Sequence, residues 1–238
     1  MKILITEFMK TSSVEILKKN FDITFDQELS TNYIKLKNSI NKFDALIVRN
    51  KTQVNQVILE NATNLKFIGR LGVGLDNIDT EYCKNNNIHV QPATGMNADS
   101  VAEFVINSSL SLLKNTLLMH QETLLGNWPR TSISSRELKG KTIGFLGFGL
   151  IAKKVSLLAN VFNAQIIAHD PFVGQNIGDE FNAKLLSMNE LFELADIISI
   201  HLNLTEDTYQ IINKFYLDLM KKHSIIINAS RGGIIDEE

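Results

Sequence analysis

The chain has 238 residues, of which 44% are hydrophobic and 21% charged, a composition typical of globular proteins and a length sufficient for two domains. The net charge of −2 gives no basic field of the kind that binds nucleic acid or an anionic membrane, so neither partner is expected. The single cysteine, Cys83, cannot form an internal disulfide, which favours a reducing, cytoplasmic location and a buried structural thiol over a reactive one.

Residues 1–96 alternate short apolar runs with segments of helical pattern. The apolar runs predict strands at residues 3–6, 22–25, 45–48, 67–69 and 89–91. The segments between them predict helices at residues 12–19, 32–38, 54–61 and 80–86. This alternation is typical of the α/β class, in which a parallel sheet carries helices on both faces.

A second series of the same kind follows a loop marked by Pro92 and Asn97, so we expect a first domain at residues 1–96 and a second at residues 97–238. The predicted elements are helix 100–114, strand 142–146, helix 150–162, strand 165–169, helix 188–193, strand 197–201, helix 214–220 and strand 224–229. The longest apolar helical segment, residues 101–119, is interrupted by polar side chains and is predicted to be a buried helix rather than a membrane span.

Loops that follow the strands of such sheets are the expected ligand sites. Ligands of doubly wound sheets lie beyond the carboxyl ends of the strands, where the strand order reverses. This rule selects the loops at residues 49–52, 72–77, 147–149, 201–205 and 229–233. Because these loops come from both predicted domains, we expect the ligand site to be a cleft between the two.

The segment 141–152, KTIGFLGFGLIA, carries the clearest functional signal. Its apolar run turns at Gly147 and Gly149 and opens a helical pattern, and the next predicted strand ends in Asp170. Gly147 permits a tight turn, Gly149 lets the backbone approach a pyrophosphate, and the helix N-terminus offers N–H groups to that pyrophosphate. The Asp170 carboxylate suits an adenosine ribose. A glycine turn alone could be a plain strand–helix connection, but this context favours dinucleotide binding.

Two cationic positions predict an anionic substrate, although each arginine could instead stabilise its own loop. Arg70 lies in a glycine-rich loop, residues 69–79, whose N–H groups suit a carboxylate. Arg231 follows the last predicted strand, where a guanidinium can clamp a carboxylate and polarise a carbonyl. Hydride transfer to or from an alcohol also needs a proton partner. His201, at a strand end, is the one internal candidate, and no orienting carboxylate is evident beside it.

The order of these motifs resembles the D-isomer-specific 2-hydroxyacid dehydrogenases, and most closely the D-3-phosphoglycerate dehydrogenases. The matching segments are residues 48–52, 69–79, 97–103, 126–128, 144–149, 169–171 and 228–236. The resemblance implies two doubly wound parallel-sheet domains. The N-terminal domain, residues 1–96, is then a flavodoxin-like substrate domain, and residues 97–238 are a Rossmann NAD-binding domain that is incomplete at its C-terminal end.

The resemblance also implies roles for individual residues. Arg231 matches the family's catalytic arginine, which binds the substrate carboxylate and keto oxygen, and the backbone of Val73 and Gly74 matches a segment that meets substrate and nicotinamide. The other implied substrate-binding residues are Arg49, Arg70 and Asn97. The implied cofactor-binding residues are Val73, Gly147, Gly149, Leu150, Ile151, Asp170, Leu202, Ala229, Ser230 and Arg231, and no metal site is implied.

The sequence departs from the family pattern in several places. Ala152 replaces the usual third glycine, Leu150 replaces a more usual polar or basic residue, and Asn203 replaces a common proline. The family's catalytic glutamate and histidine lie further beyond the arginine than this sequence reaches. We therefore expect a fragment of a longer protein, with a natural short form as the alternative, and negligible turnover by this chain.

Together these features predict an oxidoreductase that moves a hydride between NAD and C2 of a D-2-hydroxy acid. 3-Phosphoglycerate, in serine biosynthesis, is the favoured substrate, and Asp170 without a neighbouring arginine favours NAD over NADP. The alternatives are a glyoxylate or hydroxypyruvate reductase of the same family and a non-catalytic NAD-sensing interaction protein. The resemblance also implies a homodimer in which residues 101–119 and the Trp128 arm cross between subunits.

Overall fold

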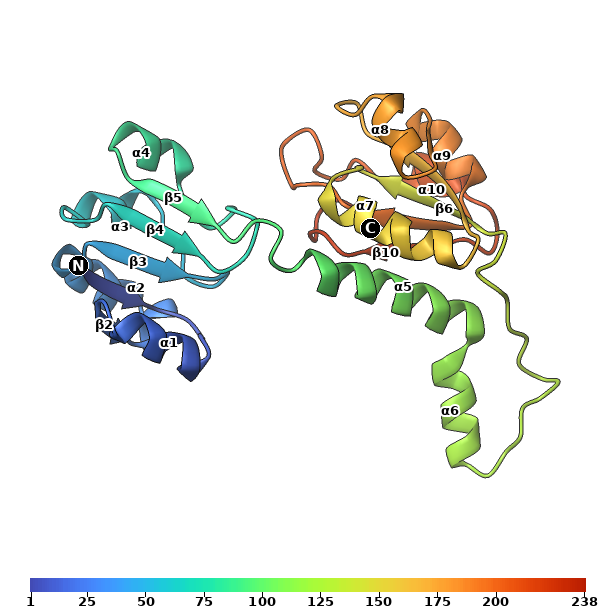
Figure 1. The fold of residues 1–238 in the computed structure, drawn as a ribbon, viewed down its shortest axis with the longest axis horizontal. Helices are drawn as coiled ribbons and strands as arrows, with labels where there is room; N and C mark the ends of the chain where they lie inside the picture. The colour runs from blue at the N-terminus through green and yellow to red at the C-terminus, as the bar shows by residue number, and fades with distance from the viewer. The chain divides into compact units, whose positions relative to one another are not determined.

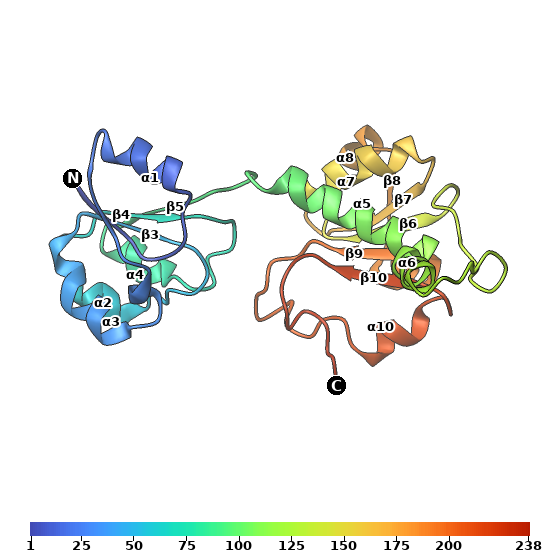
Figure 2. The same ribbon diagram turned by 90° about the horizontal axis from the view of Figure 1, so that it is seen from below.

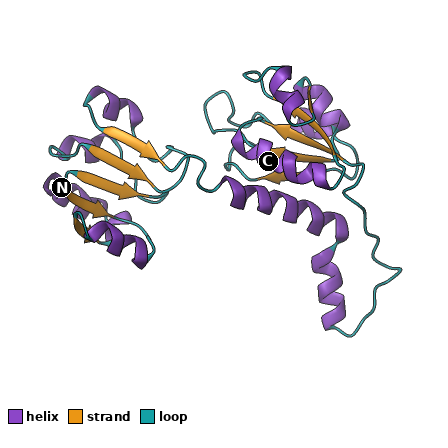
Figure 3. Ribbon diagram, viewed as in Figure 1, coloured by secondary structure: helices purple, strands orange, loops and turns teal.

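The computed structural model describes residues 1–238, which divide into two compact units, Met1–Met96 and Asn97–Glu238. Each unit is built around one five-stranded sheet with helices packed against it (Figure 3). All strand pairs are parallel, which confirms the α/β class predicted from the alternating pattern. No helix combines the length and the apolar character that a membrane span requires.

The first unit has a flavodoxin-like sheet. In chain order its strands and helices are β1 (Lys2–Ile5), α1 (Thr11–Lys18), β2 (Asp22–Phe25), α2 (Tyr33–Ser39), β3 (Ala45–Val48), α3 (Gln56–Asn61), β4 (Phe67–Arg70), α4 (Thr80–Asn85) and β5 (His89–Pro92), with short 3-10 helices at Gln27–Ser30 and Ile40–Lys42 (Figure 1). The strand order is β2-β1-β3-β4-β5, the order of flavodoxin-like folds. The direction of winding reverses between β1 and β3, so the loops after these two strands flank a potential ligand site.

The two faces of the first sheet are covered by different helices because side chains alternate along each strand. Leu4 and Leu46 belong to one buried cluster, which includes residues of α2, α3 and α4. Ile3 and Ile5 belong to a second cluster with Val14 of α1 on the opposite face (Figure 2). The apolar runs of β1 and β3 are therefore buried on both faces, as is usual for inner strands of parallel sheets.

The second unit has the strand order of a dinucleotide-binding sheet. Its elements are α5 (Ala98–Lys114), α6 (Thr116–Leu124), β6 (Thr142–Leu146), α7 (Leu150–Val161), β7 (Gln165–His169), α8 (Gln175–Glu180), β8 (Ala183–Leu185), α9 (Met188–Leu194), β9 (Ile197–Ile200), α10 (Lys214–Leu219) and β10 (Ile225–Asn228). The sheet order is β10-β9-β6-β7-β8. Counted within the unit and from the other edge this is 3-2-1-4-5, the Rossmann order, and it reverses between β6 and β9.

Two helices cover each face of the second sheet. Val105 of α5 and Val155 of α7 share one buried cluster. Leu191 of α9 shares another with Tyr216 and Leu217 of α10, which lies on the opposite side of the sheet from α7 (Figure 2). The glycine turn between β6 and α7 thus follows the carboxyl end of the central strand of this packed unit.

The prediction of one buried helix over residues 101–119 is wrong beyond Lys114. Asn115 adopts a left-handed conformation with φ of 53°, and its side-chain amide donates to the carbonyl of Ser134 at 2.7 Å. The chain therefore changes direction there, because a left-handed residue interrupts the helical hydrogen bonds. The following helix, α6, contains no buried residue and extends away from the sheet (Figure 1).

The remaining predicted strands and helices are all present, with ends that differ by at most two residues. The sequence pattern did not predict α8 and β8. The α8 segment, QNIGDE, has a single large apolar side chain and β8 has only three residues, so neither shows hydrophobic periodicity.

Candidate functional site

The turn after β6 accepts only glycine at its first position. Gly147 has a φ of +86°, a conformation that side chains disfavour, and a Cβ atom there would lie 2.7 Å from the carbonyl oxygen of His201. The N–H of Gly147 donates to the carbonyl of His169 at 2.9 Å. The turn is therefore packed between the ends of the strands on either side of β6.

The second glycine of the turn lies beside an open helix N-terminus. Gly149 precedes α7, a helix of 12 residues, and no side chain caps that end. The backbone N–H groups of Gly149, Leu150 and Ile151 form no hydrogen bond within the chain, and a Cβ atom at Gly149 would meet nothing within 4 Å. Unpaired N–H groups and the positive end of the helix dipole bind anions, so this end fits the pyrophosphate of a dinucleotide.

The two departures from the family pattern near this turn have simple structural consequences. Ala152 is fully buried in the core of the second unit, so its methyl group is accommodated against the sheet. Leu150 is 51% exposed in the first turn of α7 and offers only its backbone N–H to a ligand.

Asp170 is connected to the glycine turn through its carboxylate. Its Oδ2 accepts the N–H of Phe148 at 2.8 Å, and its Oδ1 accepts the N–H of Phe172 at 2.9 Å. A carboxylate has about four acceptor positions. Each oxygen therefore retains acceptor capacity for a ribose hydroxyl while it also holds the turn in place.

His201 is not arranged as a proton donor. Its Nε2 lies 2.9 Å from the hydroxyl of Ser199, and its ring packs against Phe145 with the ring centres 5.8 Å apart. Burial lowers the pKa of His201 to about 4, so the imidazole is neutral at pH 7. No histidine of the chain contacts a carboxylate. His201 therefore lacks both the charge and the orienting partner that an acid catalyst needs.

The loop after β10 is fastened to the end of β9. The hydroxyl of Ser230 donates to the carbonyl of Ile200 at 2.7 Å, and the N–H of Ser230 donates to the side chain of Asn228 at 3.0 Å. The Asn228 amide in turn donates to the carbonyl of Arg231 at 2.8 Å, and the Arg231 guanidinium to the carbonyl of Ser230 at 2.9 Å. This loop, which includes the half-buried Ala229, therefore holds Arg231 in one backbone conformation.

Three of the loops selected from the sequence, together with Asp170, thus lie along one edge of the second sheet. The order β10-β9-β6-β7 places the Arg231 loop, His201, the glycine turn and Asp170 at consecutive strand ends. Leu202 adjoins the turn, since its Cδ2 lies 3.1 Å from the position of a Cβ at Gly147. Asn97, the residue that precedes α5, is exposed and its side chain forms no capping bond.

The first unit places its candidate residues at the ends of β3 and β4, which are neighbours in its sheet. Arg49 is exposed, directly after β3. Arg70 ends β4, and its guanidinium lies where a Cβ at Gly72 would be, so a side chain at Gly72 would displace the Arg70 side chain. The N–H groups of Val73 and Gly74 form no hydrogen bond within the chain, as an anion-binding backbone requires.

Sequence reasoning missed Glu7, a carboxylate in the loop after β1. Its side chain is almost fully buried and accepts hydrogen bonds from the loop that carries Arg49. The only sequence signal was an acidic residue directly after a buried strand.

The remaining functional expectations concern Cys83 and metals. Cys83 is fully buried in α4, and burial raises the pKa of its thiol to about 11, which makes it unreactive at neutral pH. No group of three or more potential ligand side chains is placed to hold a metal ion.

Comparisons with known proteins agree with this geometry. Residues 106–238 match the family model described as the NAD binding domain of D-isomer specific 2-hydroxyacid dehydrogenases, so the cofactor is NAD. The chain is 39% identical to (S)-sulfolactate dehydrogenase of Chromohalobacter salexigens, over 99% of this chain and 76% of that protein. It is 36% identical to D-3-phosphoglycerate dehydrogenase of Methanocaldococcus jannaschii, over all of this chain and 45% of that protein. It is also 36% identical to hydroxypyruvate reductase of Thermotoga maritima, over 93% of this chain and 70% of that protein.

Solved structures share the fold. The PH0520 protein of Pyrococcus horikoshii superposes with a TM-score of 0.83 at 29% identity, over 99% of this chain and 72% of that one. A D-lactate dehydrogenase of Aquifex aeolicus, solved with NAD and lactic acid, superposes with a TM-score of 0.88 at 24% identity. The match covers 99% of this chain and 71% of that one. The match to the family model and the 39% identity to a relative of which the chain covers 76% show that the chain belongs to the D-isomer-specific 2-hydroxyacid dehydrogenase family.

Proposed function

We propose that the protein oxidises the C2 hydroxyl of a D-2-hydroxy acid, or reduces the corresponding keto acid, with NAD as the hydride carrier. One observation carries the proposal. The open N-terminus of α7, the Asp170 carboxylate and the Arg231 loop lie along the carboxyl edge of one sheet. These groups have the chemistry to bind a pyrophosphate, a ribose diol and a substrate carboxylate, respectively.

The residues of the chain bind and orient the reactants. The N–H groups at the start of α7 hold the pyrophosphate, and Asp170 binds the ribose. Arg231 binds the substrate carboxylate and stabilises negative charge on the C2 oxygen. NAD, when bound, supplies the hydride acceptor. The Nε2 atom of His201 is engaged with Ser199 and no carboxylate orients its ring, so we propose that this chain binds its ligands with negligible turnover.

The substrate that we favour carries a second anionic group, as 3-phosphoglycerate does. The loop after β3 exposes Arg49 and Lys51, two cations that suit such a group. Serine biosynthesis is the corresponding pathway, since several relatives are D-3-phosphoglycerate dehydrogenases. The relative with 39% identity is named for sulfolactate, whose second anion is a sulfonate, and this favours sulfolactate as the second candidate.

Titration calorimetry of the 238-residue chain tests the proposal. NADH is expected to bind first, and the NADH complex is then titrated with 3-phosphoglycerate, sulfolactate and glyoxylate. Tighter binding of 3-phosphoglycerate supports the favoured substrate, whereas tighter binding of glyoxylate indicates the glyoxylate or hydroxypyruvate reductase alternative. Binding of NADH with none of the three acids indicates the non-catalytic NAD-sensing alternative.

A matched pair of arginine variants tests the role of Arg231. We expect Arg231→Ala to weaken binding of the hydroxy acid about 10-fold or more, because a charge-assisted hydrogen bond contributes about 1.5–3 kcal/mol. NADH affinity is expected to change less. Arg136 is the control, because its guanidinium also donates to a backbone carbonyl, that of His223 at 2.8 Å, and it is not among the strand-end residues. Equal losses in Arg231→Ala and Arg136→Ala contradict the assignment.

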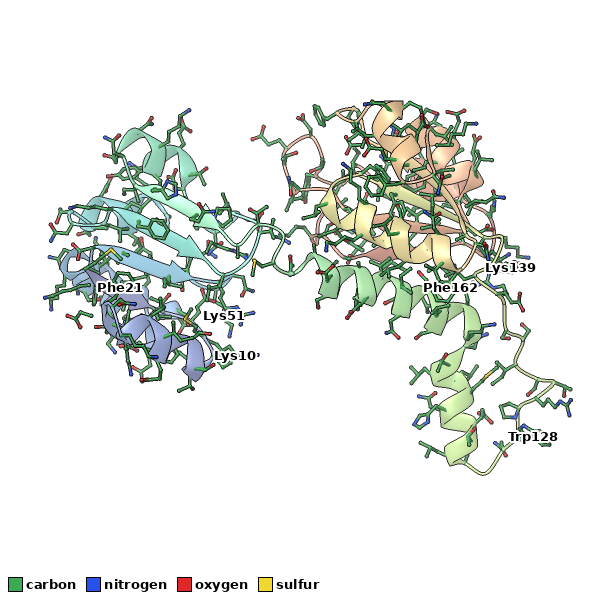
Figure 4. The ribbon with its side chains drawn as sticks, in the orientation of Figure 1. Lys10, Phe21, Lys51, Trp128, Lys139 and Phe162 are labelled. Atoms are coloured by element: carbon green, nitrogen blue, oxygen red, sulfur yellow. The ribbon has the colours of Figure 1, made fainter.

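A homodimer and a cytoplasmic location complete the proposal. The exposed faces of α6 and the loop that follows it support the dimer, since Leu117, Leu124 and Trp128 are 69%, 73% and 83% exposed. Figure 4 shows Trp128 on the extended loop beyond α6. Several large apolar side chains exposed on one helix and its following loop are typical of a protein–protein interface. The single, buried cysteine is compatible with the cytoplasm.

A further inference from the structure

We propose that Glu7 is a positioning residue that holds the loop 49–52 in the backbone conformation that presents Arg49 and Lys51 to the substrate. The role of this loop in substrate binding rests on the proposed function. The geometry around Glu7 is independent of it, because every contact described below lies within the first unit.

The Glu7 carboxylate fills a ring of backbone N–H groups. Its Oε1 accepts from Arg49 at 2.8 Å and from Thr52 at 3.0 Å. Its Oε2 accepts from Asn50 at 3.2 Å and from Lys51 at 3.1 Å. Successive N–H groups that converge on one point form an anion-binding nest, and here the anion is the chain's own side chain. Only 5% of Glu7 is exposed, so these bonds are largely shielded from water.

Further side-chain bonds hold the same loop from its other side. The hydroxyls of Thr6 and Thr52 lie 2.8 Å apart, and both residues are buried. The Asn77 amide donates to the carbonyls of Arg49 at 3.1 Å and Thr52 at 2.7 Å. Three loops, which follow β1, β3 and β4, are thereby joined at the edge of the sheet where the winding reverses between β1 and β3.

The consequence of this arrangement is an outward orientation of the loop's side chains. With its N–H groups committed to Glu7, the loop leaves Arg49, Asn50 and Lys51 exposed. These side chains line a hollow of about 140 Å³ together with Glu7, Phe8, Gln27 and Ser30. Figure 4 shows Lys51 at the edge of the unit toward which its strands point. Glu7 thus fixes the backbone positions of Arg49 and Lys51 through their N–H groups and leaves their side chains exposed.

A carboxylate is required at this position. Burial by itself raises the pKa of the Glu7 carboxyl, but the N–H groups of Thr52, Arg49 and Lys51 lower it by more, so the pKa lies below the ordinary 4.5. Glutamine has nearly the same shape, but its NH₂ group would face two of the four N–H donors. Glu7→Gln therefore removes two acceptor contacts and adds a repulsion between donors.

Hydrogen exchange of the loop amides tests the contact directly. In the 238-residue chain, we expect Glu7→Gln to accelerate exchange of the amides of residues 49–52 about 10-fold or more, since hydrogen bonds to a charged group contribute about 1.5–3 kcal/mol. Asp44→Asn is the matched control, because Asp44 also accepts a backbone N–H, that of Lys2 at 2.6 Å, at the opposite end of the strands. Unchanged exchange in Glu7→Gln overturns the proposal.

Binding of 3-phosphoglycerate to the NADH complex tests the consequence for substrate. We expect Glu7→Gln and Arg49→Ala each to weaken this binding about 10-fold and to leave NADH affinity unchanged. The control variant Asp44→Asn is expected to bind 3-phosphoglycerate as the native chain does. If Arg49→Ala weakens binding and Glu7→Gln does not, the positioning role is overturned. If Arg49→Ala has no effect while exchange in Glu7→Gln is accelerated, the proposed role of the loop in substrate binding is the part that fails.

A second variant, Glu7→Asp, tests the proposal if Glu7→Gln does not fold. Glu7→Asp keeps the charge but is one methylene shorter, so it cannot reach all four N–H groups. We expect the amides of residues 49–52 to exchange faster, and 3-phosphoglycerate to bind more weakly, than in the native chain, with both effects smaller than in Glu7→Gln wherever both variants fold. Native exchange and native affinity in Glu7→Asp overturn the proposal.

Discussion

The carboxylate of Asp170 accepts the backbone N–H of Phe148 at 2.8 Å across a separation of 22 residues. Phe148 lies between the two glycines of the turn, and Asp170 follows the neighbouring strand, β7. The residue proposed to bind the ribose therefore also stabilises the turn proposed to bind the pyrophosphate. The two parts of the cofactor site are coupled before any ligand binds.

Replacement of Asp170 tests this coupling. We expect Asp170→Asn to weaken NADH binding about 10-fold or more, because it removes a charged acceptor from both the ribose and the turn. The preference for NADH over NADPH should also narrow, since the repulsion of the additional phosphate is lost. Fluorescence titration with both nucleotides measures the two effects. Asp179→Asn is the control, because Asp179 accepts from Gln175 within α8. Native NADH affinity in Asp170→Asn would contradict the prediction.

Substitution of the two glycines of the turn is expected to affect different properties, stability at Gly147 and NADH affinity at Gly149. Gly147→Ala strains a backbone with φ of +86° and presses a methyl group against the carbonyl of His201, so the second unit should lose stability by about 1–3 kcal/mol. Gly149→Ala meets no atom within 4 Å, so its stability should remain close to native while NADH affinity falls. Thermal unfolding and NADH titration of both variants separate the two effects. Equal losses of stability in the two variants would contradict this prediction.

The pKa of His201 predicts acid sensitivity. Burial lowers this pKa from 6.5 to about 4, so the unfolded chain takes up a proton at a higher pH than the folded chain does. Stability should therefore fall as the pH decreases from 6.5 to about 4, by up to about 1.4 kcal/mol per pH unit. Urea unfolding at several pH values measures the slope. His201→Gln should reduce it, and the exposed His120→Gln should not. Equal slopes in all three proteins would rule out His201 as the cause.

The exposed surface of α6 predicts the oligomeric state. We expect sedimentation at micromolar concentration to show a dimer, and Leu117→Glu combined with Trp128→Ala to give a monomer, because a buried charge and a lost aromatic anchor both oppose association. Phe215→Glu, at an exposed apolar position on α10, is the control. A native species of only 26.7 kDa would exclude the dimer.

The α/β class, both sheets and the cofactor turn followed from the sequence because each is encoded in contiguous residues. Strands 142–146 and 165–169 have the predicted bounds, since short apolar runs between polar segments are recognisable without tertiary information. The glycine spacing of the turn likewise reports a local backbone requirement at Gly147. Residues with these signals need no distant partner to be identified.

Only the tertiary structure decided which distant groups meet. Glu7 joins N–H groups 42 to 45 residues away because β1 and β3 are adjacent in the sheet, and no local pattern contains that adjacency. The neutral state of His201 follows from its burial against Phe145 and Ser199, and the exposure of α6 follows from the left-handed Asn115. Local sequence sets backbone preference and apolar periodicity, whereas burial and long-range hydrogen bonding depend on the order in which the strands assemble.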